Sequence, residues 1–386
     1  MKKPFSAAAG RFAAFFSQTR TQFLLGLLVT LLVTLAEVVK WKQRNFFIYR
    51  NATLDLWAGR MPYGPEWTAS VGPDAFLYGP LFTLLFTPFA WLPPWLGPFA
   101  WNIGNFLLFF YAIRSLPLSE TKKTRFYFFV FLMMANNLMY YQYNLVVASI
   151  FLLAYAFLEK GRPMASILLI GVSGFTKIYG VFQYAFLLFY QRTWRNVFLY
   201  VLPTLLILAL LPLVMLSPRE LLNTYTSWIS SFPWHFQSRP WMSVFHIRLL
   251  FSAVPVSTIP YQLGALALLS LLSLWRLNRS ADAGFRAQTT GIMMGWVILF
   301  SNSPEIGTYL IAMTGLALWY YNSQPVKGEK ILFALNFFLF MIVPQDVLCP
   351  KPIMRLLIEK AQLHLLVFLS TWLWMIWKTY GPKQPS

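Results

Sequence analysis

Lys177 stands out among the residues that could do chemistry, because it joins two apolar segments, GVSGFTK and IYGVFQYAFLLFY. An ionisable side chain at such a place is expected to face a cavity or a partner. A lysine can also extend its ammonium group to lipid headgroups. We therefore expect Lys177 to bind an anionic group, with headgroup contact as the alternative.

The stretch 40–94 holds a second group of candidates, in which basic, acidic and aromatic residues alternate with apolar ones. Its arginines could bind a phosphate, its tyrosines could contact a substrate, and carboxylates in and near it could act as acid, base or hydroxyl acceptor. These candidates are Glu37, Arg44, Tyr49, Arg50, Glu66, Asp74 and Tyr78. The alternative is an interfacial collar, because aromatic rings mark the headgroup level and basic groups meet lipid phosphate there.

Two short polar turns interrupt the apolar segments elsewhere. The turn YYQYN at 140–144 offers Gln142 and Asn144, and the turn NSPE at 302–305 offers Glu305. Such side chains either hydrogen-bond a ligand or cap a helix, and capping is the commoner use. We include all three as candidate substrate contacts, with capping as the favoured alternative for Glu305.

Several other chemistries find no support in the sequence. It has no Gly-x-Ser-x-Gly nucleophile motif, no phosphate-binding Gly-rich Lys-Ser/Thr loop and no His-Glu-x-x-His zinc motif. His235 and His246 stand 11 positions apart, unlike a compact zinc pair. The single cysteine, Cys349, cannot form an internal disulfide. We therefore expect neither a metal nor a cofactor.

The elements that position these residues are predicted to be membrane helices, because the chain is 58% hydrophobic and 11% charged. A spanning helix needs roughly 17 to 25 mostly apolar residues. The stretches that approach this length are 22–39, 95–113, 126–141, 144–158, 163–177, 178–191, 195–216, 261–277, 286–302, 306–322, 329–344 and 361–378. We predict an all-α, polytopic membrane bundle of about 12 transmembrane helices. The net charge of +19 lies in short loops between these stretches, so we expect no nucleic-acid partner.

The stretch 79–92 could either cross the bilayer or lie in the interface, and charge decides between the two. If it lies flat, 19 of the 31 Lys and Arg and 4 of the 12 acidic residues fall on the side of both termini. Basic loops favour the cytoplasm. We therefore predict cytoplasmic termini and an external first loop at 40–94 with two or three interfacial helices, one of them at 79–92. The predicted cytoplasmic loops are 114–125, 159–162, 192–195, 276–286 and 327–330.

The whole chain, 1–386, is predicted to form one membrane domain, because helices that share a bilayer usually pack as one bundle. Residues 217–260 are predicted to form a second external loop, and residues 261–386 to form the C-terminal transmembrane helices. Basic residues and phenylalanines in the first 20 positions suggest a short interfacial helix before an uncleaved span.

The order of the polar motifs resembles glycosyltransferase family 87, multi-pass enzymes of the GT-C class that use polyprenyl-phosphate sugars as donors. The resemblance covers most of the first 215 positions, and beyond 216 it is mainly one of hydropathy. It rests on Asn45-Phe46, Tyr49, Ala52, Gly59, Pro62-Tyr63, Tyr78-Gly79-Pro80-Leu81, Pro88, Leu92-Pro93, Trp101-Asn102, Gln142-Tyr143-Asn144, Thr176-Lys177-Ile178-Tyr179 and Gln191-Arg192-Thr193-Trp194-Arg195. Each motif is weak alone, while their order and spacing are more specific.

This resemblance implies a GT-C-like catalytic module at 1–216, with its active site on the external, periplasmic face of a bacterial inner membrane. The implied reaction moves a mannose-like hexose or a pentose from a polyprenyl-phosphate donor to a hydroxyl of a glycan or glycolipid acceptor. In the related aminoarabinose transferase, a similar Thr-Lys helps to bind the donor phosphate. Lys177 thereby becomes the leading phosphate contact, with help from Arg44 or Arg50.

The sequence departs from the family pattern at one position. Family 87 members usually have Asp-Phe where this chain has Asn45-Phe46, and that Asp is the expected general base. Asn45 cannot take up a proton at neutral pH. Either another carboxylate replaces the base or transferase activity is lost. Asp74 is our first replacement, followed by Glu66, Glu37 and Glu305, each of which could be a structural ion-pair partner instead.

Two other functions remain open at this stage. A flippase or transporter for a lipid-linked solute would use the same broken helices and Lys177 without a base. A carrier needs polar access from both faces, however, whereas the polar helix ends predicted here lie on the external face. A catalytically inactive relative would bind the lipid without turnover, and Asn45 is the main argument for it.

Overall fold

The computed structural model describes residues 15–71, 74–236, 242–251, 257–302, 304–345 and 347–382, and all regular secondary structure within these ranges is helical. Most of the interfacial helix predicted at the start of the chain lies outside the described residues, as do Ser303 and the side chain of His235. The predicted all-α class is confirmed for the described part of the chain.

The first half of the chain begins with α2, which is followed by three short helices and then by longer ones. The bounds are α2 (Thr19–Val39), α3 (Arg44–Trp57), α4 (Pro65–Val71), α5 (Pro80–Ala90), α6 (Gly97–Ser115), α7 (Glu120–Met139), α8 (Asn144–Glu159) and α9 (Pro163–Thr176). A 3-10 helix, η1 (Ile178–Phe189), follows α9 directly. The break between the two helices falls at Lys177, whose backbone is extended.

The second half contains longer helices joined by 3-10 and π-helical turns. The bounds are α10 (Gln191–Leu210), η2 (Leu211–Val214), α11 (Pro218–Phe236), η3 (Val244–His246), α12 (Ile259–Trp275), η4 (Leu277–Arg279), α13 (Ala283–Leu299), η5 (Ile306–Thr308), α14 (Tyr309–Tyr321), α15 (Lys327–Phe337), η6 (Phe338–Ile342), α16 (Lys351–Met354), η7 (Arg355–Lys360) and α17 (Leu363–Tyr380).

Each of the predicted spans coincides with a helix of the structure, but length and composition single out few of them as membrane spans. In the described part of the chain, α2 alone is long and apolar enough to cross a membrane as one helix. The number rises to at most three if two bent pairs, 199–232 and 351–380, each count as one span. The number of transmembrane helices therefore stays a prediction.

The centre of the bundle is built from helices that are apolar on every side. Twelve residues of α14 are buried, and α14 packs extensively against α13. Gly291 on α13 and Gly315 on α14 let the two helices approach closely, because a Cβ atom on Gly291 would collide with the Gly315 carbonyl oxygen. Small residues at such crossings are typical of membrane bundles. Around this pair, buried side chains from α3 to α17 form a continuous hydrophobic core.

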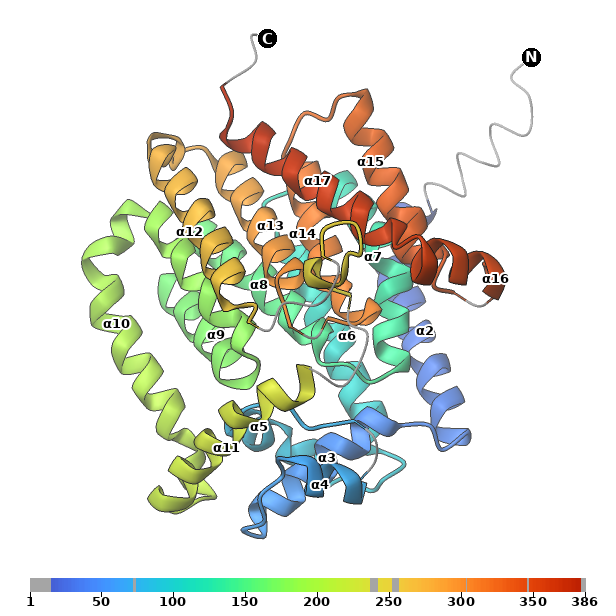
Figure 1. Ribbon diagram of the computed structural model, residues 1–386, viewed down its shortest axis with the longest axis vertical. Helices are drawn as coiled ribbons and strands as arrows, with labels where there is room; N and C mark the ends of the chain where they lie inside the picture. The colour runs from blue at the N-terminus through green and yellow to red at the C-terminus, as the bar shows by residue number, and fades with distance from the viewer. Residues whose placement is uncertain are drawn as a thin grey trace.

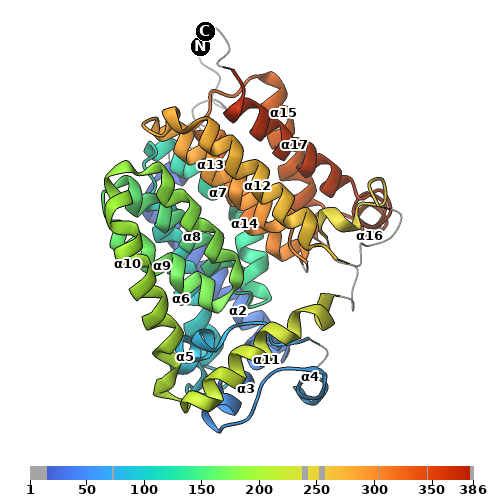
Figure 2. The ribbon, with the colours of Figure 1, turned by 60° about the vertical axis from the view of Figure 1, so that its left-hand side comes forward.

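The two ends of the bundle differ in character. Helices α3, α4, α5 and α11 gather at one end, and the end of α17 lies at the other (Figures 1 and 2). The predicted cytoplasmic loops 276–286 and 159–162 contact each other through Arg286 and Glu159 at 2.7 Å, and Lys122 of the loop 114–125 donates to the carbonyl oxygen of Tyr321 at the end of α14 at 2.6 Å. The structure thus brings loops that are far apart in sequence to one end of the bundle.

Both predicted external loops contain helices. The first loop contains α3, α4 and α5, which agrees with the two or three short helices predicted there. An α5 of 11 residues is about 16 Å long, about half the roughly 30 Å of a bilayer core. The second predicted loop, at 217–260, contains α11, which occupies 218–236, packs on α5 and was not expected from the sequence. In α11, polar and apolar residues alternate with helical period, so no continuous apolar run marks it.

Candidate active site

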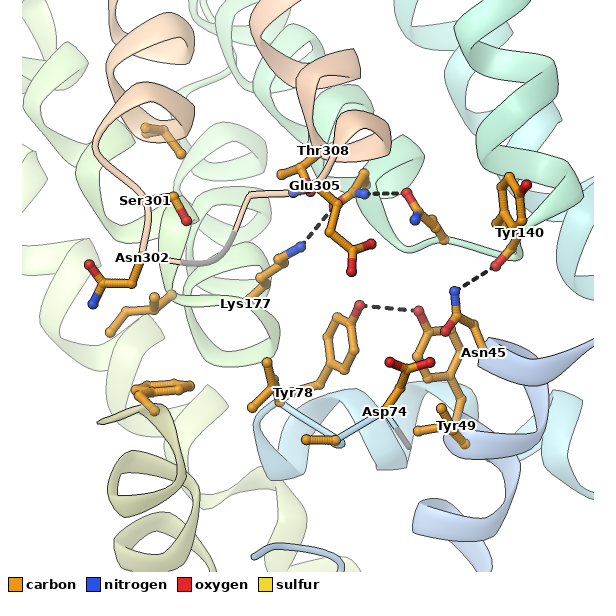
Figure 3. Close-up of a pocket in the computed structure, with 18 of the residues that line it drawn as sticks. Asn45, Tyr49, Asp74, Tyr78, Tyr140, Lys177, Ser301, Asn302, Glu305 and Thr308 are labelled. Atoms are coloured by element: carbon orange, nitrogen blue, oxygen red, sulfur yellow. Dashed lines mark hydrogen bonds between the residues drawn. The ribbon is translucent and has the colours of Figure 1, made fainter. Parts of the chain in front are cut away.

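A cavity of about 1390 Å³ lies between the short helices of the first loop and the ends of the longer helices (Figure 3). Ten of the twelve residues singled out from the sequence line it. They are Glu37, Arg44, Asn45, Tyr49, Asp74, Tyr78, Gln142, Asn144, Lys177 and Glu305. Residues separated by up to 268 positions in the chain therefore meet at one place.

Lys177 enters this cavity at the break between α9 and η1. Its Nζ donates a hydrogen bond to Oδ1 of Asn144 at 2.8 Å, and Nδ2 of Asn144 donates to Oε1 of Gln142 at 2.7 Å. The ammonium also lies 5.8 Å from the ring centroid of Tyr78. The Lys177 side chain is therefore held between the polar turn at 140–144 and the ring of Tyr78.

The place of Lys177 is set by contacts between α5 and the end of α9. The Gly79 N–H donates to the carbonyl oxygen of Thr176 at 3.0 Å, and the Tyr143 hydroxyl donates to Oγ1 of Thr176 at 2.9 Å. A Cβ atom on Gly79 would collide with the carbonyl oxygen of Phe175. Only glycine permits this approach, which places the Tyr78-Gly79-Pro80 motif directly against the Thr176-Lys177 motif.

Two tyrosines form the floor beside Lys177. The hydroxyls of Tyr49 and Tyr78 lie 3.1 Å apart, and the Tyr63 hydroxyl donates to the carbonyl oxygen of Tyr78 at 2.8 Å. Burial raises the pKa of Tyr49 well above its usual value, and the Tyr78 hydroxyl partly offsets that rise. The Tyr49 phenol therefore stays neutral at physiological pH, and both hydroxyls can orient polar groups of a ligand.

Two carboxylates enter the same space from different elements. Oδ2 of Asp74 lies 3.0 Å from Nε of Arg44 on α3. Glu305 is the N-cap residue directly before η5, in a capping box with Thr308, and its backbone N–H donates to Oγ1 of Thr308 at 3.2 Å. The capping role expected for Glu305 is thus present, and its carboxylate also points into the cavity, above Asp74 (Figure 3). Capping and ligand contact are compatible at this residue.

Asn45 has a defined role in the structure. Its Nδ2 donates to the carbonyl oxygen of Tyr140 at 2.8 Å, which ties α3 to the turn between α7 and α8. An ionised aspartate has no hydrogen to donate to a carbonyl oxygen. The amide at position 45 therefore suits the backbone that faces it in this chain.

Three further candidates lie at or beyond the edge of the cavity. Glu37, at the end of α2, lines it and lies 4.0 Å from Nζ of Lys40. Glu66 is exposed on α4 and does not line the cavity. Arg50 does not line it either, because six positions along α3 turn its side chain about 240° from that of Arg44. Glu66 and Arg50 therefore do not join the other candidates in the lining of the cavity.

Other lining residues were not singled out from the sequence. Most of the apolar ones come from η1, α11, α12 and α13, and the polar ones are Lys42, Tyr140, Ser257, Thr258, Gln262, Ser301, Asn302 and Thr308. Gln262 was the clearest signal, because it interrupts an apolar helix. Among the residues that the structure describes, no three His, Cys, Asp or Glu side chains lie close enough together to hold a metal ion.

Comparison with known proteins supplies the family. No curated protein matches the chain. The sequence model of glycosyltransferase family 87 matches residues 76–302. This range starts after Asn45 and Asp74 and extends past position 216, where we expected the detailed resemblance to end. It includes Tyr78, Lys177 and the polar turn up to Asn302, and it covers more than half of the chain. The chain therefore belongs to glycosyltransferase family 87.

Proposed function

We propose that this glycosyltransferase moves a sugar from a polyprenyl-phosphate donor to a hydroxyl of a glycan or glycolipid on the external face of the membrane. The observation that carries the proposal is one cavity in which the ammonium of Lys177, the carboxylates of Asp74 and Glu305, and a long apolar wall meet. A lipid phosphate that bears a sugar needs all three kinds of surface.

The apolar wall suits the isoprenoid tail. Side chains from η1, α11 and α12 line it, including Phe182, Ile229, Phe232, Leu263 and Leu266. Lys177 stands between this wall and the polar floor made by Tyr49 and Tyr78. A phosphate at the head of the tail would meet the ammonium of Lys177, a compact cation that can neutralise a leaving group.

The chemistry assigned to the site is a displacement at the anomeric carbon. The acceptor oxygen forms a bond to that carbon, the bond between the carbon and the phosphate oxygen breaks, and the lipid phosphate leaves with the electron pair. Lys177 stabilises the charge that develops on the phosphate. Asp74 is our proposed base and accepts the proton of the acceptor hydroxyl. Arg44 holds the Asp74 carboxylate in place.

The proposed orientation places the cavity outside the cell. The end of the bundle that carries α3, α4 and α5 lies opposite the loops that carry most of the basic residues (Figure 2). Because basic loops favour the cytoplasm, the cavity would face the external side of a bacterial inner membrane. An acceptor would then enter from outside, while the donor lipid would enter from the bilayer.

Turnover in proteoliposomes tests this proposal. The assay supplies a panel of polyprenyl-phosphate hexoses and pentoses, together with lipid-linked and free oligosaccharide acceptors. We expect Lys177→Ala and Asp74→Asn each to lower turnover about 10²- to 10⁴-fold. Lys160→Ala is the matched control, because Lys160 is an exposed lysine at the end of α8. Wild-type turnover that both cavity variants retain would overturn the assignment, and lipid binding without turnover would favour an inactive relative.

A further inference from the structure

A polar cluster on the α12 and α13 side of the cavity is built around the amide of Asn302. Oδ1 of Asn302 accepts one hydrogen bond from the Thr258 hydroxyl and another from Nε2 of Gln262, both at 2.7 Å. Nε2 of Gln262 also donates to the carbonyl oxygen of Phe300 at 2.8 Å. All four residues line the cavity.

These contacts determine the positions of the oxygen and the nitrogen of the Asn302 amide. A backbone carbonyl can only accept, so the Gln262 atom beside the Phe300 carbonyl oxygen is its NH₂ group. The Asn302 atom beside that NH₂ group must then be an acceptor, and it is Oδ1. Both lone pairs of Oδ1 are occupied. The Asn302 NH₂ group is therefore the part that this side chain can offer to a ligand.

The NH₂ group of Asn302 is accessible and has no hydrogen-bond partner within the described ranges. Its nitrogen is not one of the buried side-chain atoms without a partner, and no described residue accepts a hydrogen bond from it. Figure 3 shows Asn302 on the far side of Lys177 from Asn45. A donor that is oriented by two neighbours is thus presented to the cavity.

The wall around Asn302 is uncharged. The part of the described lining that belongs to 257–302 consists of Ser257, Thr258, Ile259, Gln262, Leu263, Leu266, Trp296, Val297, Phe300, Ser301 and Asn302. The basic residues of the lining, Lys42, Arg44 and Lys177, come from other segments. An oriented amide donor with aromatic neighbours suits a neutral sugar oxygen, whereas a phosphate would be stabilised by a cation.

We propose that Asn302, oriented by Thr258 and Gln262, binds a neutral hydroxyl of a sugar and forms a carbohydrate subsite distinct from the Lys177 phosphate site. The inference deepens the proposed function and rests on it. The sugar can come from two sources, the residue carried by the lipid donor or a residue of the acceptor. Both present the same chemistry, so the experiment must separate them.

Binding to the purified full-length protein gives a readout that does not require turnover. Three probes are titrated by calorimetry: bare polyprenyl phosphate, a panel of polyprenyl-phosphate hexoses and pentoses, and a panel of hexose and pentose disaccharides. Asn302→Leu keeps the size of the side chain and removes the donor. We expect it to weaken binding of one sugar-bearing probe about tenfold, which is about 1.4 kcal/mol. Binding of bare polyprenyl phosphate should be unchanged.

Further variants separate the subsite from a loss of folding. Thr258→Val removes one of the two bonds that orient Asn302 and should weaken the same probe by a smaller factor. Thr226→Val is its matched control, because Thr226 is exposed on α11 and does not line the cavity. Asn302→Asp should weaken binding less than Asn302→Leu, because a sugar hydroxyl can turn and donate to the new carboxylate. Affinities are compared only among variants whose thermal unfolding temperature matches that of the wild type.

The probe that Asn302→Leu affects identifies the source of the sugar. A loss for the sugar-bearing lipid alone assigns the subsite to the donor, and a loss for the disaccharide assigns it to the acceptor. The subsite is overturned if neither loses affinity, or if Asn302→Asp weakens binding more than Asn302→Leu, as an anionic oxygen would require. The proposed function fails separately if Lys177→Ala binds bare polyprenyl phosphate as tightly as the wild type does.

Discussion

The positive charge of Lys177 gives the proposed phosphate site a signature that substitution can test. Its Nζ lies 2.8 Å from Oδ1 of Asn144, and both residues line the cavity. The phosphodiester of a polyprenyl-phosphate sugar carries a negative charge that a cation stabilises. Lys177→Met, which keeps the length of the side chain and removes the charge, should therefore weaken binding of a polyprenyl-phosphate sugar about tenfold or more in a calorimetric titration.

Arginine at position 177 is the control for this prediction. Lys177→Arg keeps a positive charge, because a guanidinium does not lose its proton in proteins. Its affinity can differ from that of the wild type, because the guanidinium has another shape, but it should exceed the affinity of Lys177→Met. Equal affinity of Lys177→Met and the wild type would show that Lys177 does not carry the charge that binds phosphate.

Asn45 permits a second prediction at the level of a single residue. In Asn45→Asp a carboxylate would face the carbonyl oxygen of Tyr140, which now accepts a hydrogen bond at 2.8 Å. We expect the free energy of unfolding to fall by about 1 kcal/mol or more, because a hydrogen bond is lost and two acceptors face each other. Thermal unfolding in detergent measures this, with Asn45→Ala as the variant that removes the bond alone.

The same variant tests whether the family aspartate can be restored. Turnover of Asn45→Asp should not exceed that of the wild type, because the surroundings of position 45 favour an amide. A variant that is both more stable and more active than the wild type would contradict this reading and would make Asn45 a lost base.

Helix α5 and the end of α9 provide the clearest test of an element. A methyl group at position 79 would collide with the carbonyl oxygen of Phe175, so Gly79→Ala should push α5 away from α9. We expect weaker binding of polyprenyl phosphate and a loss of turnover of about tenfold or more, since misplaced catalytic groups are costly. The backbone at Gly79 is in the ordinary extended region, so collision and not strain is the cause.

Gly104 supplies the matched control for that substitution. It lies within α6, and a Cβ atom there would have no neighbour within 4 Å. Gly104→Ala should therefore leave turnover unchanged and slightly stabilise the helix, because alanine favours helix over glycine. Equal losses in both variants would show that the close contact between α5 and α9 has no special role.

Elements differ in how far the sequence could predict them. Continuous apolar runs mark helices such as α8, and the predicted range 144–158 agrees with the observed Asn144–Glu159 to one residue. Helix α11 was not predicted, because its apolar residues are spaced along one face and a search for unbroken apolar runs does not detect that pattern. Polar residues at breaks between apolar runs, such as Lys177, were recognisable because an unbroken apolar run on each side marks the break.

The side of the cavity that α12 and the end of α13 form could not be predicted from the sequence. Asn302 and Gln262 are 40 positions apart and become neighbours only when α12 packs beside the end of α13. Each residue alone resembles an ordinary polar turn or an isolated glutamine in a helix. Arg50 was included with Arg44 because both are basic and close in sequence, although helix geometry turns them to different faces.

The whole molecule has two ends of opposite character, and their position relative to the membrane can be tested directly. Lys378 contacts Glu329 at 2.6 Å at the end that carries the basic loops, and α4 lies at the other end (Figure 1). Cys349 is the single cysteine and is buried, so Cys349→Ser gives a background without thiols. Single cysteines can then be placed at Glu66 on α4 and at Gly328 on α15, both of which are exposed.

Labelling with a membrane-impermeant maleimide then reports the orientation. In cells whose outer membrane is permeable to the reagent, Glu66→Cys should be modified, and Gly328→Cys should be modified only after the inner membrane is broken. The reason is electrostatic, because 19 of the 31 basic residues lie on the side assigned to the cytoplasm. The opposite labelling pattern would place the cavity in the cytoplasm, and an acceptor would then have to be a cytoplasmic one. Labelling of both cysteines in intact cells would show that the two ends do not lie on opposite sides of a membrane.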